Sequence, residues 1–508
     1  PLLLADVFPV WHQGKAQCDP NHQINPGKIA TPHDGLALIP IDAVPTRGQK
    51  DRTISNSNWV SNADALYCNG NGACFNYDPF DDMCPSYKAT GDRRHSPKGR
   101  ASLMREWLRI MSDMRVDVMQ ERDIDRFVWS PLRFIPRAWN SLRQQMGAYD
   151  FSHDVYDAMA GCLACKSCTG SCPVKVDVPE FRSRFMELYF GRYLRPIRHY
   201  GIGSLEGLLP WLARIRPLYN GVVASKIGMG LMARVAGLTA MPQLSGSTVQ
   251  KARRRMHIPW ATDKVLAALS ESDRSRAVII VQDGFTSYFD AEVVIDSIKL
   301  YQRLGFYPML MPYQGNGKPY HVQGLITAFE RSAKAMKARL EQLTRYEIPL
   351  VGVDPSMTLT FRSEYKKAFP TFEAAVLLPQ EFLSQRLDAI AAHRLATPSA
   401  PYFVMGHCTE RSNAPDSLRQ WQAVFQALAV PIEEVKVGCC GMAGTYGHEL
   451  QHQTNSKRLF EISWAPALAA PERSGRVLST GYSCRAQTQR MTQTALQHPL
   501  QALLKELS

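Results

Sequence analysis

The sequence lacks the long uncharged hydrophobic run that a membrane-spanning helix needs. Such a helix takes about 20 predominantly apolar residues. The most apolar region, residues 201–244, is interrupted by five charged side chains: Glu206, Arg214, Arg216, Lys226 and Arg234. Residues 1–11 have neither the basic segment nor the small-residue cleavage site of a signal peptide. We therefore expect a cytoplasmic protein without a spanning helix.

Familiar catalytic motifs are also missing. The sequence contains neither a Walker phosphate-binding loop nor the HExxH helix of a zinc protease. Gly201-x-Gly203 lacks the preceding strand of a dinucleotide-binding loop, and the 13 histidines are not arranged at ligand spacing. The candidate functional residues must therefore belong to other motifs.

What the sequence does have is a set of 12 cysteines, most of them gathered in short segments. A disulfide framework would instead be spread over a small secreted domain. Clustered cysteines in a chain without a secretion signal indicate metal binding or redox chemistry in a reducing compartment.

The strongest pattern is a run of four cysteines separated by two, two and three residues. It consists of Cys162, Cys165, Cys168 and Cys172-Pro173. Ferredoxin-type iron–sulfur modules have this spacing, and their fourth cysteine ligates the neighbouring cluster. A structural zinc site is the alternative, but it usually shows two separate cysteine pairs. The run therefore predicts an iron–sulfur module.

A second, altered copy of this run lies upstream. It consists of Cys68, Cys74 and Cys84-Pro85, with Asn71 where the middle cysteine would stand. By the crossed-ligand rule, Cys84 completes a cluster with the first three cysteines of the later run. We predict a [4Fe–4S] cluster on four thiolates: Cys84, Cys162, Cys165 and Cys168.

Three cysteines remain for a second cluster site: Cys68, Cys74 and Cys172. Three thiolates leave open a [3Fe–4S] cluster, a [4Fe–4S] cluster with a non-cysteine ligand, or an empty site. Four cations follow Cys84: Arg93, Arg94, Lys98 and Arg100. They either raise the potential of a nearby cluster or are ordinary surface cations.

A third group of cysteines lies near the end of the chain. It consists of Cys408, Cys439, Cys440 and Cys484, and the adjacent pair is followed by Gly441. Four thiolates brought together by strand-end loops could bind zinc or an iron–sulfur cluster. Buried unreactive cysteines, or thiols lining a small-molecule pocket, are the alternatives.

The pattern of apolar residues predicts a mixed α and β protein. We expect helices from Ser96-Pro97 onward and over residues 178–193, because Ser is a good N-cap and Pro suits the first helical position. Buried strands are expected at 277–282, 307–311, 348–353 and 401–405, and a helix at 291–304. We predict five regions: a tail and linker at 1–55, a helical ferredoxin-like domain at 56–200, a basic helical connector at 201–274, and α/β repeats at 275–395 and 396–508.

The two predicted repeats correspond at three motifs, in the same order and at nearly the same spacing. Asp283-Gly284-Phe285 corresponds to His407-Cys408-Thr409, and Asp354-Pro355-Ser356-Met357 corresponds to Gly481-Tyr482-Ser483-Cys484. Tyr313-Gln314-Gly315 corresponds to Cys439-Cys440-Gly441. Because the first copy has no cysteine at these positions, we expect a thiolate cluster only in the second.

Residues 181–260 are strongly basic, with thirteen Lys or Arg and two Glu. A basic helical segment with apolar patches can lie on an anionic membrane. It can equally pack against another domain or a second copy of the chain, or form a solvated face. These alternatives remain open.

Four motifs resemble the iron–sulfur half of large FAD-linked D-2-hydroxyacid dehydrogenases, the fused type that includes bacterial D-2-hydroxyglutarate dehydrogenase. They are Cys68-Asn69-Gly70-Asn71-Gly72, Met83-Cys84-Pro85-Ser86-Tyr87, Ser96-Pro97-Lys98-Gly99-Arg100 and the four-cysteine run. The segment from Gly438 to Glu449 resembles the cysteine-rich CCG domain of these enzymes. Cys484-x2-Gln487 departs from the Cys-x2-Cys ending of many relatives, which argues against a double or noncubane cluster.

The resemblance also implies a flavin domain. Asn25, Pro26, Gly27 and Lys28 look like the end of an FAD-binding oxidase domain, so we expect Pro1 to be internal to a longer polypeptide. The implied activity is oxidation of a D-2-hydroxyacid at a flavin, with clusters passing electrons to a quinone or an electron-transfer protein. A homo-oligomer is expected, and peripheral contact with the inner membrane is left open.

Two rival hypotheses differ in class. One is a separate iron–sulfur subunit of a quinone-linked glycolate, lactate or glycerol-3-phosphate dehydrogenase, which an upstream reading frame would exclude. The other is a metal-stapled scaffold that binds nucleic acid through its basic segment, which a brown protein absorbing near 400 nm would exclude. We expect no nucleic-acid partner.

Overall fold

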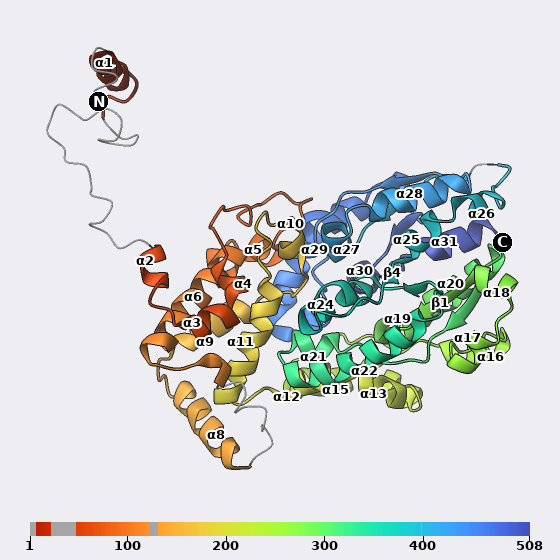
Figure 1. The fold of residues 1–508 in the computed structure, drawn as a ribbon, viewed down its shortest axis with the longest axis horizontal. Helices are drawn as coiled ribbons and strands as arrows, with labels where there is room; N and C mark the ends of the chain where they lie inside the picture. Colours follow the sequence, from red (N-terminus) through yellow and green to blue (C-terminus); the bar gives the residue numbers. More distant parts are fainter. Residues whose placement is uncertain (1–6, 22–46, 121–130, 398) are drawn as a thin grey trace.

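The computed structural model describes residues 7–21, 47–120, 131–397 and 399–508 (Figure 1). A helical part with the seven clustered cysteines from Cys68 to Cys172 lies at one end, and two α/β units occupy the other end (Figure 1). The prediction of a mixed α and β protein is confirmed. The predicted flavin-contacting residues Asn25, Pro26, Gly27 and Lys28 lie outside the described residues.

The helical part begins its longest helix where the sequence predicts it. The Ser96 hydroxyl accepts a hydrogen bond from the Gly99 amide at 3.0 Å, and Pro97 takes the first helical position of α6. The second predicted helix is α11, which starts at Val178. The helices of this part, with the outlying α1, are α1 (Phe8–Cys18), α2 (Arg47–Asp51), α3 (Asn56–Ser61), α4 (Ala63–Leu66), α5 (Pro85–Thr90), η1 (Arg93–His95), α6 (Pro97–Asp113), α8 (Pro131–Gln145), α9 (Phe151–Ala160), α10 (Ser167–Ser171) and α11 (Val178–Arg192).

The core of this part forms where α6, α9 and α11 meet. Trp107 of α6 packs edge-on against Phe185 of α11, with ring centroids 5.2 Å apart. Four cysteines belong to the same buried cluster of side chains: Cys68, Cys74, Cys84 and Cys168. The candidate ligands therefore sit in packed protein, where their positions are fixed.

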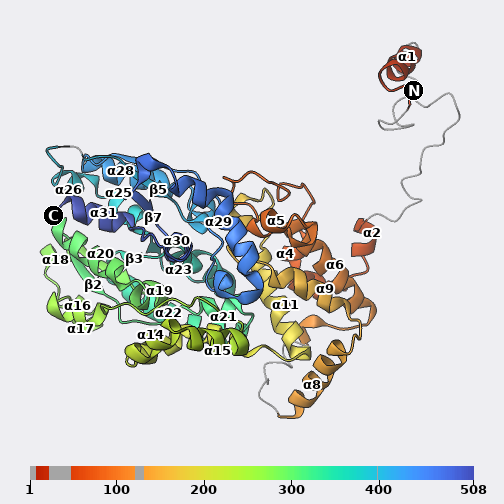
Figure 2. The same cartoon turned by 180° about the vertical axis from the view of Figure 1, so that it is seen from behind.

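Seven helices connect the helical part to the α/β units along the lower edge of the molecule (Figures 1 and 2). They are α12 (Ile197–Gly203), α13 (Leu205–Leu212), α14 (Arg216–Ala224), α15 (Lys226–Ala236), α16 (Val249–Arg255), α17 (Asp263–Ala267) and α18 (Glu271–Arg276). No helix among the described residues is long and apolar enough to cross a membrane, as the sequence predicted.

The first α/β unit contains a parallel sheet with strand order β2-β1-β3-β4. Strand β1 is buried over its whole length, which explains its unbroken apolar sequence. The elements are β1 (Ala277–Val281), α19 (Gly284–Tyr288), α20 (Ala291–Arg303), β2 (Tyr307–Leu310), α21 (Lys318–Val322), α22 (Ile326–Thr344), β3 (Leu350–Gly352), α23 (Pro355–Thr358), η2 (Leu359–Arg362), α24 (Glu364–Ala368), β4 (Val376–Leu377), α25 (Pro379–Ser384) and α26 (Leu387–Ala391).

The second α/β unit has a parallel sheet of order β6-β5-β7, which matches the β2-β1-β3 part of the first. Its elements are β5 (Tyr402–Met405), α27 (Cys408–Asn413), α28 (Ser417–Ala427), β6 (Ile432–Glu434), η3 (Tyr446–His448), η4 (Leu450–His452), α29 (Gln453–Leu468), η5 (Pro471–Arg473), β7 (Val477–Ser479), α30 (Tyr482–Thr492) and α31 (Pro499–Glu506). Strands thus form at all four places where the sequence predicts them. The matching strand order of the two sheets agrees with the predicted repeat. The exact domain boundaries stay predictions.

The two units share one hydrophobic core. Val278 and Ile280 of β1 belong to the same buried cluster as Val404 of β5, Trp421 of α28 and Leu500 of α31. Helix α20 packs against α31 across the junction. Because both sheets are parallel, the loops after their strands meet at their carboxyl ends, where ligands of α/β proteins usually bind.

Candidate functional site

One cavity is lined by the four cysteines predicted to share a cluster: Cys84, Cys162, Cys165 and Cys168. Cys84 caps α5 with a left-handed backbone, φ +40°, which turns the chain sharply before Pro85. Ala164 and Lys166 are also left-handed, so the loop between the other cysteines curls around the cavity. The Ala164 amide donates to the Cys162 sulfur at 3.4 Å. The sequence prediction of which residues meet here therefore agrees with the structure.

A buried cation lies beside this cavity. Arg100 also lines it, is 1% exposed, and its Nη1 lies 3.8 Å from the Cys84 sulfur. Its other donors reach the Ala158 carbonyl at 2.7 Å and the Ser86 hydroxyl at 2.8 Å. The partners found for Arg100 among the described residues are uncharged, the carbonyls of Ala158 and His95 and the Ser86 hydroxyl, so a group with net negative charge, such as a cluster on four thiolates, fits this place.

The other three predicted cations, Arg93, Arg94 and Lys98, lie in different surroundings from Arg100. The Lys98 ammonium lies 3.2 Å from the Gly70 carbonyl oxygen in the second cysteine loop. Arg93 stacks over Phe75, and Arg94 pairs with Asp92 at the surface. The two alternatives left open by the sequence thus apply to different residues: Arg100 and Lys98 approach the cysteines, and Arg94 is a surface cation.

Three thiols of the first cavity, those of Cys84, Cys165 and Cys168, hold their protons when no metal is bound. Burial raises the pKa of Cys84 and of Cys165 to about 12, and it raises the pKa of Cys168 well above its usual range. Because thiolates are the ligands of iron, loading a cluster releases these protons.

A second cavity is lined by the remaining three cysteines of the helical part: Cys68, Cys74 and Cys172. Gly70 and Gly72, with φ +75° and +83°, let the loop between the first two cysteines wind around the cavity. Asn71 also lines it, but its amide oxygen already accepts the Ala73 amide at 2.9 Å. The structure groups the three predicted ligands and leaves the cluster type a prediction.

The first and second cavities are neighbours. Pro97, at the start of α6, lines both of them. Cys172 ends α10, the helix that contains Cys168, so one short helix carries ligands for both predicted clusters. This is the crossed arrangement that the cysteine spacing predicts.

The third group of cysteines also comes together. Cys408 opens α27, Cys439 and Cys440 lie in the loop after β6, and Cys484 lies in α30. Their side chains interact in sequence, Cys408 with Cys439, Cys439 with Cys440, and Cys440 with Cys484. Hydrogen bonding to Cys439, together with burial, raises the pKa of Cys408 well above its usual range.

The described part of the chain contains no three His, Cys, Asp or Glu side chains arranged to hold a single metal ion. Zinc and an iron–sulfur cluster therefore both stay open for the third group. The metal at this group stays a prediction.

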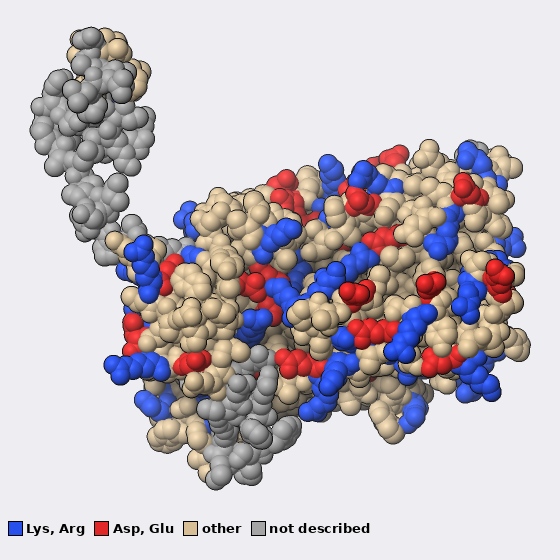
Figure 3. Space-filling view, viewed as in Figure 1, with Lys and Arg blue, Asp and Glu red and all other residues tan. Residues whose placement is uncertain are grey.

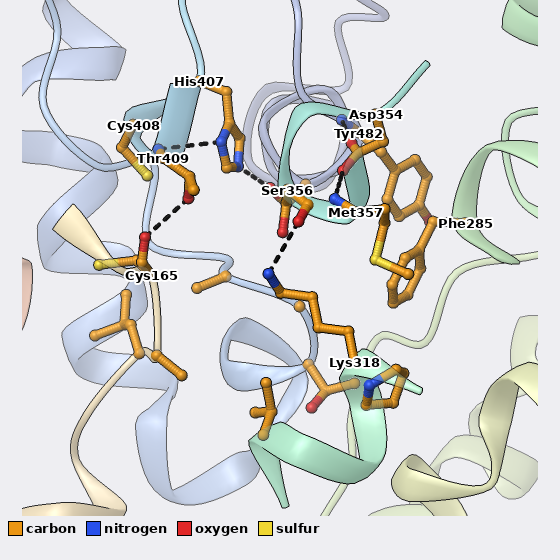
Figure 4. Close-up of a pocket in the computed structure, with 18 of the residues that line it drawn as sticks. Cys165, Phe285, Lys318, Asp354, Ser356, Met357, His407, Cys408, Thr409 and Tyr482 are labelled. Atoms are coloured by element: carbon orange, nitrogen blue, oxygen red, sulfur yellow. Dashed lines mark hydrogen bonds between the residues drawn. The ribbon is translucent and has the colours of Figure 1, made fainter. Parts of the chain in front are cut away.

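An open space, called the large cavity below, lies between the loops of the two α/β units (Figure 4). Cys408, Cys439 and Cys440 line it on one side, so the alternative of thiols lining a pocket is compatible with the structure. Phe285 and Tyr482 stack on the opposite side, with ring centroids 5.6 Å apart (Figure 4).

Polar side chains in this cavity are held by neighbouring protein groups. The Lys318 ammonium donates to the Ser356 carbonyl and the Thr360 hydroxyl, both at 2.9 Å. The Asp354 carboxylate accepts the amides of Met357 and Tyr482 at 3.1 and 2.9 Å (Figure 4). The cavity is therefore preorganised, with aromatic and apolar walls and fixed dipoles.

The first cavity and the large cavity meet at Cys165 and Leu163, which line both. The Thr409 hydroxyl, next to Cys408, donates to the Cys165 carbonyl at 2.9 Å (Figure 4). The three cysteine groups thus form a continuous series, joined first by Pro97 and then by Cys165 and Leu163.

Residues 64–176 match the family model of a 4Fe-4S dicluster domain. This range contains all seven cysteines that line the two cavities of the helical part, so iron–sulfur binding follows for that part of the chain. No solved structure matches the chain significantly.

Over its whole length the chain is similar to proteins named D-2-hydroxyglutarate dehydrogenase. It is 47% identical to the Pseudomonas putida protein, over 99% of this chain and 50% of that protein. It is 41% identical to the Escherichia coli protein and 38% identical to the Haemophilus influenzae protein, over 98% of this chain and 49% of each. The chain spans about half the length of the curated relatives it matches.

Sequence reasoning missed the large cavity, although it aligned many of the residues that line it. Phe285, His407, Asp354 and Tyr482 were matched between the repeats and given no role. The signal that could have found them is their common position after parallel strands, whose carboxyl ends converge. Lys318 lies at the start of α21, follows no strand directly, and had no such signal.

Proposed function

We propose that the chain is the electron-transfer half of a FAD- and iron–sulfur-dependent D-2-hydroxyacid dehydrogenase, with D-2-hydroxyglutarate as the substrate. The observation that supports this most directly is the meeting of Cys84 with Cys162, Cys165 and Cys168 in one cavity. The dicluster match and the names of the relatives support the same reaction class.

In this proposal the flavin, bound outside the described residues, would supply the two-electron oxidation of the hydroxyacid to a 2-oxoacid. The cysteines of this chain would hold iron–sulfur clusters, each of which carries one electron at a time. The site at Cys68, Cys74 and Cys172 adjoins the four-cysteine site through Pro97, and that site adjoins the third thiol group through Cys165. Two one-electron transfers along this series would remove both electrons from the flavin, and the two protons of the oxidation would leave to solvent.

The large cavity is the proposed place where a small acceptor takes up the electrons. Its stacked Phe285 and Tyr482 offer an aromatic wall to a planar ring, such as that of a quinone. The Cys408, Cys439 and Cys440 thiols line the same space. An electron-transfer protein is the competing acceptor.

The experiment loads the 508-residue chain with iron and sulfide under anaerobic conditions and records its EPR and visible spectra. Dithionite should reduce the clusters, whereas D-2-hydroxyglutarate alone should not, because this proposal places the flavin in the other half of the enzyme. Adding the flavin-containing half, expressed separately, should let the hydroxyacid reduce the same clusters.

Two results would contradict the proposal. One is a colourless chain that takes up no iron after reconstitution. The other is a loaded chain whose clusters stay oxidised when the flavin half, shown to be reduced by the hydroxyacid, is present. A Phe285→Ala variant addresses the acceptor site separately, since it should slow quinone reduction and leave cluster reduction by dithionite unchanged.

A further inference from the structure

Three consecutive helices of the connector, α13, α14 and α15, turn apolar side chains toward solvent. Eight large ones are exposed: Leu208, Trp211, Ile215, Leu218, Val222, Ile227, Leu231 and Val235. Soluble proteins rarely leave an apolar patch of this kind uncovered unless something binds there. We call these eight residues the apolar face.

The apolar face follows helical spacing. In α15 the exposed side chains stand at positions 227, 231 and 235, one helical turn apart, and Ile227 is 87% exposed. Helix α15 has no buried residue at all. A stripe that would normally face a core thus faces outward, so the helix has an unpartnered apolar side.

The helices that carry this face are anchored to the protein. The buried Glu206 carboxylate of α13 accepts the Gly317 amide at 2.8 Å. In α14 the Asn220 side chain exchanges hydrogen bonds with the backbone of Leu244 at 2.8 and 2.9 Å. After α15, the Thr239 amide donates to the His448 carbonyl at 2.8 Å. The outward orientation is therefore built into the fold.

The chain segment that carries the apolar face has exposed charges of one sign, since the one acid of its helices, Glu206, is buried. Residues 207–262 contain no Asp or Glu. Four cations lie on or beside the three helices: Arg214, Arg216, Lys226 and Arg234. Arg214 stacks on Trp211, with 4.3 Å between the guanidinium carbon and the ring centroid. In Figure 3 the projection at the lower edge, below the α/β units, is largely tan with blue beside it.

We propose that the apolar face of α13–α15 docks on the surface of an anionic lipid bilayer. Exposed Trp, Leu, Ile and Val with flanking Arg and Lys are the composition of interfacial membrane helices. Because residues 207–262 contain no Asp or Glu, nothing in this segment repels anionic headgroups. Each Lys or Arg near the lipid surface strengthens the attraction to those headgroups. A symmetric contact with a second copy would instead oppose four cations with the same four cations.

The position of these helices beside the large cavity gives the membrane contact a function. Ile202 of α12 and Leu205 of α13 line the large cavity, and Leu208 is exposed less than one turn later. Docking here brings the wall of that cavity to the lipid surface, where a lipid-soluble acceptor is found. This consequence rests on the proposed function, whereas membrane binding itself does not.

The test is co-sedimentation of the 508-residue chain with phosphatidylcholine vesicles that contain phosphatidylglycerol or lack it. Binding should require the anionic lipid and should weaken as salt rises, because salt screens the attraction. Replacing Arg214 or Arg234 with Gln should weaken binding about fivefold each, on the order expected for one cation near an anionic surface. The double variant Leu218→Glu/Ile227→Glu should abolish binding.

The matched control is Val60→Glu, which places the same charge on a 68% exposed position of α3. Its binding should equal that of the unaltered chain, and all variants should keep the same melting temperature because the replaced side chains are exposed. As a second readout, brominated lipid should quench Trp211, seen as a difference from a Trp211→Phe variant.

Several outcomes would overturn the proposal. They are absence of co-sedimentation at low salt, equal binding to both vesicle types, and unchanged binding by the folded double variant. Capture of the face by the flavin-containing half, so that the two halves together no longer bind vesicles, would also overturn it in favour of a protein interface. None of these results depends on whether the chain transfers electrons.

Discussion

The Thr409 hydroxyl donates a 2.9 Å hydrogen bond to the Cys165 carbonyl, joining residues 244 positions apart. Thr409 follows a cysteine of the third group, and Cys165 belongs to the four-cysteine cavity. Around this bond, α10 packs against α27. The helical part and the second α/β unit are thereby held in a fixed relation at the place where electrons are proposed to cross.

A substitution at Gly170 should disturb this junction. A Cβ atom there would lie 2.0 Å from the Ser412 carbonyl oxygen, which is backbone and cannot rotate away. We expect Gly170→Ala to destabilise the protein by about 1–3 kcal/mol, the usual cost of overpacking. The measurement is the melting temperature, together with protease sensitivity of the junction.

Gly201→Ala is the control for that change, because nothing lies within 4 Å of its added Cβ. It should keep the melting temperature of the unaltered protein or raise it slightly. Equal stability of the Gly170 and Gly201 variants would show that the contact between α10 and α27 is not as tight as the structure has it.

The crossed ligands can be distinguished one cysteine at a time. Cys84→Ser should remove one thiolate from the four-cysteine site and lower its cluster content, while Cys172→Ser should affect the other site. Iron and sulfide analysis with EPR should therefore show loss of different signals in the two variants. The exposed Cys18 supplies the control, since Cys18→Ser should leave both signals intact.

The cysteine groups could be predicted because their spacing within short segments already restricts which thiols can meet. The position of strands β1, β2, β3 and β5 could be predicted for a similar reason: each is a short apolar run buried on both faces. Both features are local in the chain. The crossed role of Cys84 joins distant segments, but a general rule for this module supplies it.

The full lining of the large cavity could not be predicted, because its walls come from many loops and not only from those that directly follow parallel strands. Lys318 and Tyr482, for example, are brought together only by the packing of two sheets into one core. The exposure of the apolar face could not be predicted for a different reason. The spacing of Ile227, Leu231 and Val235 indicates an apolar stripe, but periodicity does not say whether that stripe is covered.

The charge of Arg100 should tune the cluster beside it. Arg100→Gln removes a buried cation whose Nη1 lies 3.8 Å from the Cys84 sulfur. The midpoint potential of the four-cysteine cluster should become more negative, because the added electron loses a favourable charge interaction. Redox titration followed by EPR measures the shift. Arg94→Gln, at a side chain 64% exposed, should leave the potential unchanged.

Stability should fall in mild acid because of His448. Burial, with Arg490 nearby, lowers the pKa of His448 to about 4 from the usual 6.5. Between pH 6.5 and pH 4 the His448 imidazole is protonated in the unfolded chain but stays neutral in the folded protein. The free energy of unfolding therefore decreases as pH falls from 6.5 toward 4, by about 3 kcal/mol over the whole range. Melting temperatures at pH 7.5, 6.5 and 5.5 measure this loss. The melting temperature of the His448→Gln variant should fall less steeply with decreasing pH than that of the unaltered protein. The control is His257→Gln, at an exposed position, whose melting temperature should change with pH as in the unaltered protein. Parallel slopes for all three proteins would exclude His448 as a cause.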